Sequence, residues 1–354
     1  MPPKLNFDPY VLALVAHYVI ALKKRPADIQ KLLLNNHQIK IKRHDIYNNI
    51  LPNIVRLNWL RLETPLANEL SEEVRQKAPH LEEAAVTLTS ELDDVAKHAA
   101  YTIRDLITQT ARKKEKICIG FSGGNTIRRA FQELIQALMN PALHGLSEQH
   151  TICCHALVAG FDNTAPGTFP SSFFTYLDDS PVFFKKEYVL LQAPAFVPGN
   201  ERETVLGFPG IREAQERTLN LDLIVTSAAA FADKHSQLKQ YYESQPGTSN
   251  DLKRLQDAEC VGDMLWLPIG PHGPVDMSNF DHRPVALLEL KDLPARIAGK
   301  HETKVLLVIG PCAHPSEPCV ESKAPVLEAI LNLPERYVTH LVADRRTASE
   351  FLKM

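Results

Sequence analysis

The chain has 354 residues, a net charge of −3 and an apolar content of 44%, which excludes general disorder and predicts two or three domains at roughly 100–200 residues each. Its six cysteines include no C-x-x-C pair, so a disulfide framework is excluded and structural zinc is disfavoured. We therefore expect a cytoplasmic protein with no bound metal and no cofactor. No apolar run reaches the roughly 18 residues of a membrane span, so no membrane partner is expected.

Charge is distributed unevenly along the chain. Residues 1–62 hold ten Lys or Arg against three Asp or Glu, whereas the other residues hold 29 against 39. Such asymmetry is typical of a contact with nucleic acid or a membrane at one end. We take residues 1–62 and 63–354 as two domains.

The basic segment predicts three short helices. The apolar residues of 9–22 favour a buried helix, since Lys23-Lys24-Arg25 follows them where a signal segment would have a cleavage site. Pro26 suits the first turn of a second helix, which the turn signal Asn35-Asn36 ends. A third helix is expected over about 43–56, and residues 57–62 resemble a short strand or wing. This order is typical of a winged helix-turn-helix domain.

In that geometry the third helix enters the major groove of DNA. Lys40, Lys42 and Arg43 precede or begin it and are predicted to neutralise phosphates. The predicted base-reading side chains follow directly and are His44, Tyr47, Asn48 and Asn49. The alternative is a small helical domain that docks onto a protein partner or another subunit.

After residue 62, short apolar runs alternate with helical patterns. Strands are expected near 84–88, 117–121, 152–158, 189–191, 221–225, 285–290, 304–309 and 340–342. Helices are expected over 65–77, 93–111, 126–139, 210–219 and 324–332. The pattern predicts an α/β domain with a Rossmann-like, mostly parallel sheet, in which ligands bind beyond the carboxyl ends of the strands.

The clearest chemical signal is a glycine cluster after one predicted strand. Residues 1–119 contain no glycine, and then Gly120, Gly123 and Gly124 occur within five residues, directly before an amphipathic helix with Asn125 as the expected N-cap. Backbone N–H groups at such a helix start bind anions, and the hydroxyls of Ser122 and Thr126 would add donors.

Three known glycine motifs are candidates for this cluster. The spacing fits neither a P-loop nor the dinucleotide-binding fingerprint. It does fit the G-x-S-x-G nucleophile elbow of α/β-hydrolases, with Ser122 as nucleophile and Asp222 with His272 or His282 as partners. We disfavour that interpretation because no glycine-rich oxyanion loop precedes the serine, and we assign no catalytic residue.

The layout resembles the SorC-type sugar-binding transcriptional regulators, whose effector domain is similar in fold to ribose-5-phosphate isomerase and glucosamine-6-phosphate deaminase. The matching segments, besides the helix-turn-helix and the glycine loop, are Gln192–Val197, Leu221–Val225, Val261–Asp263 with His272-Gly273, Val305–Gly310 with Lys323, and His340–Asp344 with Thr347-Ala348. The chain departs from the family in a Pro-rich insert over 311–319. This insert holds three possible metal ligands, Cys312, His314 and Cys319, but their number and irregular spacing favour a plain loop over a metal site.

The resemblance implies a DNA-binding homo-oligomer, a dimer or tetramer, that binds operator DNA and a phosphorylated sugar. It implies that the phosphate loop comprises Ser122, Gly123, Gly124, Asn125 and Thr126, that Lys323 lies near the phosphate and that Asp263 accepts hydrogen bonds from sugar hydroxyls. Two alternatives stay open. One is an isomerase or deaminase of sugar phosphates on the same fold, and the other is a sensor whose basic segment binds protein.

Overall fold

The computed structural model describes residues 11, 15, 25–46, 50, 70–78, 80–81, 86–89, 92–139, 145–160, 166–299, 302–312 and 321–354. Most of the first and third predicted helices, the predicted wing and the boundary at residues 62 and 63 lie outside these residues.

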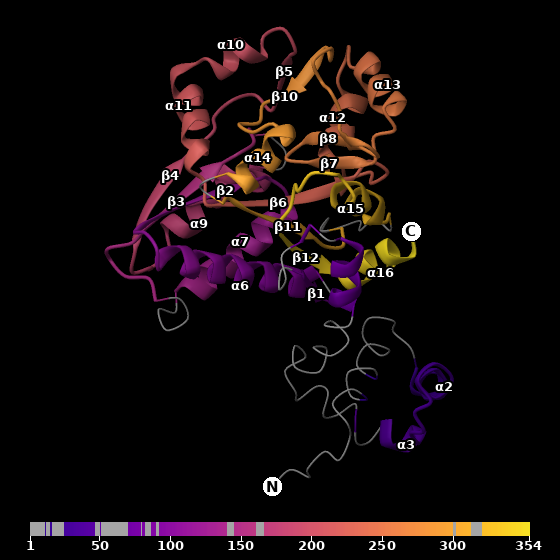
Figure 1. Ribbon diagram of the computed structural model, residues 1–354. Coiled ribbons are helices and arrows are strands. Elements are labelled where there is room, and N and C mark those ends of the chain that lie inside the picture. The colour runs from indigo at the N-terminus through magenta and orange to yellow at the C-terminus, as the bar shows by residue number, and fades with distance from the viewer. Residues whose placement is uncertain are drawn as a thin grey trace.

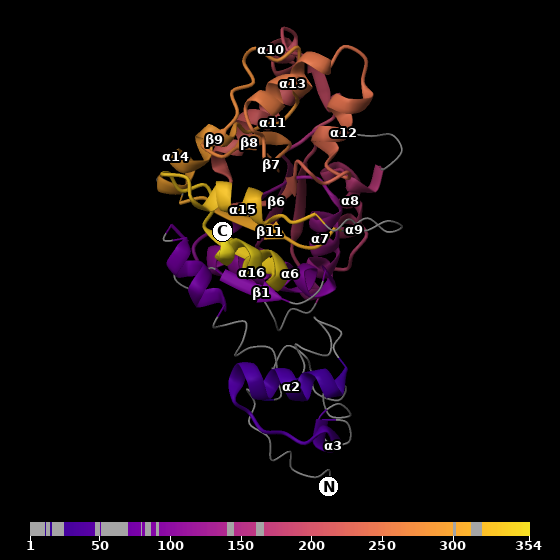
Figure 2. The same cartoon turned by 90° about the vertical axis from the view of Figure 1, so that its right-hand side faces the viewer.

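The described part of the basic segment contains two helices, α2 (Pro26–His37) and α3 (Arg43–Asp45). Helix α2 begins at Pro26 as predicted and buries Ile29 and Leu33. Its end differs from the prediction, because Asn35-Asn36 is helical and the chain turns at Gln38, whose φ of 56° is left-handed. Both helices lie apart from the α/β body (Figures 1 and 2).

The body is built on a largely parallel sheet, which confirms the predicted α/β class. In sheet order its parallel strands are β1 (Val86–Thr89), β12 (His340–Asp344), β11 (Lys304–Ile309), β6 (Leu223–Ala230), β2 (Lys116–Phe121), β3 (Thr151–Ala156) and β4 (Lys185–Val189). The chain runs from β2 to β3 on one side, whereas β6 pairs with β2 on the other. The strand order therefore reverses between β2 and β6, which is where ligands bind in open α/β sheets.

Helices α6 (Leu92–Ala111) and α7 (Asn125–Leu138) pack side by side on one face of the sheet (Figure 1). Helix α7 is strongly amphipathic, and its Phe131 packs edge-on against Phe121 of β2, with ring centroids 5.1 Å apart. Because side chains alternate along a strand, Ile117, Ile119 and Phe121 face these helices, whereas Lys116 and Cys118 face the opposite side.

The remaining helices surround the sheet and a lobe above it in Figure 1. They are α8 (Pro170–Phe173), α9 (Thr175–Asp178), α10 (Arg202–Leu206), α11 (Pro209–Arg217), α12 (Gln237–Ser244), α13 (Ser249–Asp257), α14 (Leu293–Ala298), α15 (Ala324–Leu331) and α16 (Arg345–Lys353). Residues 70–77 are also helical.

Strand β6 extends beyond the parallel sheet. It runs over Leu223–Ala230, whereas the sequence predicted a strand over 221–225. Its last residues, Ala228–Ala230, pair antiparallel with β7 (Gly262–Met264). The antiparallel extension continues through β8 (Leu267–Gly270) and β9 (Gly273–Pro274). A separate pair joins β5 (Phe196–Pro198) to β10 (His282–Pro284). The strand predicted at 285–290 is wrong, because those residues are buried but hold only an isolated bridge from Ala286 to Val158.

Candidate functional site

The glycine loop joins β2 to α7 at the carboxyl edge of the sheet. Gly124 has a φ of 104° and a ψ of 158°, a conformation that L side chains rarely adopt, so only glycine fits without strain. The helix begins one residue earlier than predicted. Gly124 takes the N-cap position and Asn125 is the first helical residue, so the expected cap by Asn125 is wrong.

The start of α7 leaves donors for a ligand. The N–H groups of Asn125, Thr126 and Ile127 have no partner within the helix by geometry, and no side chain caps it. The Gly124 N–H, by contrast, donates to Thr168 O at 2.8 Å. These first-turn donors lie at the positive end of the helix dipole, which favours an anion.

Close packing holds the loop against its neighbours. A Cβ atom on Gly123 would lie 3.0 Å from Thr168 O and 3.3 Å from the Trp266 ring. The Ser122 N–H donates to Val225 O of β6 at 3.0 Å. Ser227, next but one along β6, places its hydroxyl 3.8 Å from the Cβ position of Gly124. The loop therefore lies at the reversal point between β2 and β6.

Asp263 and Lys323 lie within electrostatic reach of each other. Asp263 is on β7 and is only 5% exposed. Burial raises the pKa of its carboxyl to about 7, against the opposing effects of a hydrogen bond from Ser236 and the charge of Lys323. The Ser236 hydroxyl lies 3.4 Å from the Asp263 carboxylate. Lys323 is the half-buried N-cap residue of α15.

Trp266 connects this carboxyl to the glycine loop. Leu265 and Trp266 form the turn between β7 and β8 with φ values of 57° and 61°, which are strained for non-glycine residues. The turn places the Trp266 ring against Gly123. The Trp266 backbone N–H donates a hydrogen bond to the Asp263 carboxyl. Trp266, Ser227 and Ser236 were missed in the sequence because no spacing rule links them to the loop.

The hydrolase motif lacks its partner among the described residues. The Ser122 hydroxyl donates to Gly123 O at 3.3 Å rather than to a histidine. Asp222 precedes β6, at the opposite end of the parallel strands, where it accepts from the Cys118 N–H at 2.8 Å and pairs with Lys114. Asp222 is therefore engaged by Cys118 and Lys114, at the end of the sheet away from Ser122, and does not act as its partner.

The predicted DNA-contacting residues are described in part. Lys40, Lys42, Arg43 and His44 are exposed around the start of α3. Their loop is tied to α2 by the Gln30 side-chain amide, which donates to Ile41 O at 2.9 Å. Tyr47, Asn48 and Asn49 lie outside the described residues.

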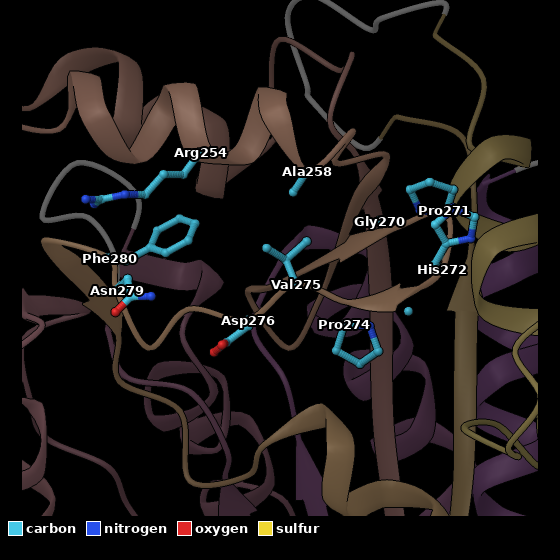
Figure 3. A pocket seen from close by; sticks show the side chains of 11 residues that line it. Arg254, Ala258, Gly270, Pro271, His272, Pro274, Val275, Asp276, Asn279 and Phe280 are labelled. Atoms are coloured by element: carbon cyan, nitrogen blue, oxygen red, sulfur yellow. The ribbon is translucent and has the colours of Figure 1, made fainter.

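The structure also shows cavities away from the loop. Figure 3 shows one of about 470 Å³ beside the β8–β9 hairpin, with Arg254 and Phe280 on one side and Pro271 and His272 on the other. None of the seven predicted effector residues lines this cavity.

The possible metal ligands of the Pro-rich insert are described in part. Cys312 contacts His235, with the Sγ atom 3.3 Å from Nδ1, whereas His314 and Cys319 lie outside the described residues.

Comparison with known proteins gives matches in structure. A scan against protein-family models finds no match, and a search of curated proteins finds none either. A DeoR family transcriptional regulator from Listeria monocytogenes superposes with a TM-score of 0.57 at 20% identity, covering 81% of this chain and 99% of that chain. A transcriptional regulator from Streptococcus pneumoniae gives 0.58 at 16%, covering 82% and 98%.

The full-length sorbitol operon regulator SorC from Klebsiella pneumoniae superposes with a TM-score of 0.55 at 17% identity, covering 98% of this chain and 99% of that chain. Within the described part of the chain, no helix combines the length and the apolar character that crossing a membrane requires. At these identities the likeness concerns the fold. The chain has the fold of the SorC- and DeoR-family transcriptional regulators.

Proposed function

We propose that the protein is a DNA-binding transcriptional regulator whose activity is controlled by a phosphorylated sugar bound at residues 122–126. Its DNA-binding domain is residues 1–62 and its effector domain residues 63–354, and it acts as a homo-oligomer on operator DNA. The alignment with the full-length sorbitol operon regulator, which covers 98% of this chain, supports a two-part regulator.

One observation supports the ligand class above the others. The uncapped start of α7, at the reversal point of the sheet, offers backbone donors to an anion. Lys323 supplies a cation near Asp263, and Asp263 supplies an acceptor, which suit a phosphate and a sugar hydroxyl respectively. A neutral sugar would leave the positive end of the helix dipole without a matching charge.

Thermal shift measurements test the ligand class, because a ligand that binds the folded state raises the melting temperature. The panel comprises sugar phosphates, the corresponding free sugars and inorganic phosphate. We expect sugar phosphates alone to give a large shift, and Lys323→Ala to reduce it. Lys353→Ala, which removes an exposed lysine from the end of α16, serves as the control and keeps the full shift. Equal shifts from free sugars, or no shift from any compound, would contradict the proposal.

A second candidate function is an isomerase or deaminase of sugar phosphates. The observation that favours it is the pKa of about 7 at Asp263, since a general base works best with a pKa near the working pH. Turnover of the compounds that shift the melting temperature decides between the two. An enzyme would form product and lose that activity in Asp263→Asn, whereas a regulator binds without forming product.

A further inference from the structure

Two cysteines and a histidine meet on the face of the sheet opposite α6 and α7. Cys118 of β2 and Cys153 of β3 are register partners, and His155 follows two residues later on the same side of β3. Their ligand atoms all lie within 4.8 Å of one another, and the Cys153 Sγ is 3.3 Å from the His155 Nε2. The side chains are 7%, 2% and 1% exposed in that order.

One of the two ring nitrogens of His155 is not satisfied by the described residues. Its Nδ1 is buried and has no hydrogen-bond partner among the described residues. A buried polar atom without a partner costs roughly 1–3 kcal/mol, so the site needs a reason to hold it. A disulfide between the two cysteines would leave the imidazole unexplained, whereas a shared ligand would engage all three side chains.

A cavity opens onto this cluster. Its volume is about 540 Å³, and Arg217 and Asn220, at and just after the end of α11, line it together with residues of the strands. Lys116 and Glu187 both line it and form an ion pair at 2.5 Å, and Lys114, which also lines it, pairs with Asp222 at 2.5 Å. The cavity gives a ligand access and leaves room for water beside the sulfur atoms.

We propose that Cys118, Cys153 and His155 bind a thiophilic metal ion of the Zn²⁺ type, and that a water molecule in the cavity is the fourth ligand. Thiolate and imidazole are the donors that such ions prefer, and three protein ligands with an open fourth position form a recognised zinc arrangement. Tetrahedral zinc with bonds of about 2.3 Å to sulfur and 2.0–2.1 Å to nitrogen separates these atoms by roughly 3.6 Å. The Cys153 Sγ and His155 Nε2 atoms are 3.3 Å apart, and no two of the three ligand atoms are more than 4.8 Å apart.

The site is independent of the proposed effector loop. Strands β2 and β3 hold the three side chains in place through their backbone pairing, so little rearrangement is needed to close around an ion. Two thiolates balance the charge of a divalent cation, and the two ion pairs beside the cavity are neutral overall, so that Arg217 adds a single positive charge.

Metal binding is measured on the full chain after reduction and removal of bound metal with a chelator. We expect the wild-type chain to take up one Zn²⁺ per chain against a chromophoric competitor, and Co²⁺ to give a thiolate charge-transfer band. Cys118→Ala and Cys153→Ala lose both signals. Cys154→Ala is the matched control, because Cys154 is adjacent in sequence, is fully buried and points to the opposite face.

Melting curves without metal establish that each variant folds. The Co²⁺ spectrum of the wild-type chain needs no substitution, so the test stands even where a variant is unstable. The proposal is overturned if the reduced wild-type chain takes up no Zn²⁺ or shows no thiolate band. Retention of metal by both cysteine variants also overturns it, as does a native disulfide whose reduced form binds no metal.

Discussion

Gly124 determines whether the loop can present its donors. With a φ of 104°, an alanine here is strained whatever space surrounds it. We expect Gly124→Ala to destabilise the fold by about 1–3 kcal/mol and to reduce the thermal shift given by sugar phosphates. Urea unfolding and the ligand panel measure the two effects.

Gly210→Ala is the control for this substitution. Gly210 lies in α11, has no atom within 4 Å of its Cβ position and has no left-handed φ. Alanine is the better helix former by roughly 1 kcal/mol, so this variant should be as stable as the wild type or more so, with the ligand shift unchanged. Equal effects at both glycines would mean that the loop conformation has no special role.

Asp263 makes stability depend on pH. Its pKa is raised to about 7 in the folded chain from an ordinary value near 4, so between these values the folded state holds a proton that the unfolded state has lost. Stability from this group is therefore present at low pH and is lost as the pH rises toward and through 7. Asp263→Asn lacks this titration. We therefore expect its free energy of unfolding, relative to that of the wild type, to be higher at pH 8 than at pH 5 by a few kcal/mol.

Urea unfolding of both proteins at the two pH values measures this difference. Asp257→Asn, at an exposed residue of α13, serves as the control and should follow the wild type at both pH values. A gap between Asp263→Asn and the wild type that stays constant from pH 5 to pH 8 contradicts the raised pKa.

At the scale of elements, the start of α16 illustrates how a sequence motif becomes structure. The segment matched as Asp344-x-x-Thr347 is a helix N-cap, in which the Asp344 carboxylate accepts from the Thr347 N–H at 3.0 Å and from its hydroxyl at 2.7 Å. We expect Asp344→Ala to cost about 1–2 kcal/mol of unfolding free energy. Asp344→Ser retains a capping oxygen and should lose less, and equal losses in thermal melts would show that capping does not contribute.

The elements predicted correctly carry their signal within one window of sequence. The continuous apolar run of β2 and the period of apolar residues in α7 identify both, because burial on two faces or on one helical face dictates those patterns. The antiparallel extension was missed. Strands β7, β8 and β9 have two to four residues each, and the turn at Leu265 and Trp266 adopts positive φ without the glycine or asparagine that signals such turns.

The candidate sites divide along the same line. The glycine loop is contiguous in sequence, so its residues could be proposed as a site from the sequence alone, and the structure corrects only the cap. Cys118 and Cys153 are 35 positions apart and become neighbours only through the pairing of β2 with β3. A search for C-x-x-C spacing detects ligands within one turn, and it has no means of finding ligands on adjacent strands.

At the scale of the whole molecule, the basic segment should bind DNA through its charges. Each phosphate neutralised by a lysine or arginine releases counterions, so affinity falls steeply with salt. We expect Lys42→Ala/Arg43→Ala to weaken binding to a duplex selected from a random library by the wild-type chain, and to lower the slope of log affinity against log salt by about 2.

The control removes the same charge from the body. Arg112 and Lys113 are exposed at and beyond the end of α6, so Arg112→Ala/Lys113→Ala tests net charge without touching α3. Fluorescence anisotropy at several salt concentrations compares the three proteins. If the two double variants lose equal affinity, the basic segment has no specific role, and a protein partner becomes the better interpretation.

The proposed DNA-binding segment and the proposed effector loop should also be coupled, and the coupling has to be reciprocal. If a sugar phosphate changes the affinity for DNA by some factor, typically 5–150-fold for allosteric proteins, DNA must change the affinity for that sugar phosphate by the same factor. Anisotropy titrations with and without ligand give one factor, and calorimetry of the ligand with and without the selected duplex gives the other. Lys323→Ala should still bind the duplex but respond weakly to ligand, whereas Lys42→Ala/Arg43→Ala should bind ligand with unchanged affinity and the duplex poorly. A ligand that binds tightly at residues 122–126 and leaves DNA affinity unchanged would have equal affinity for both states, and it would then not be the effector.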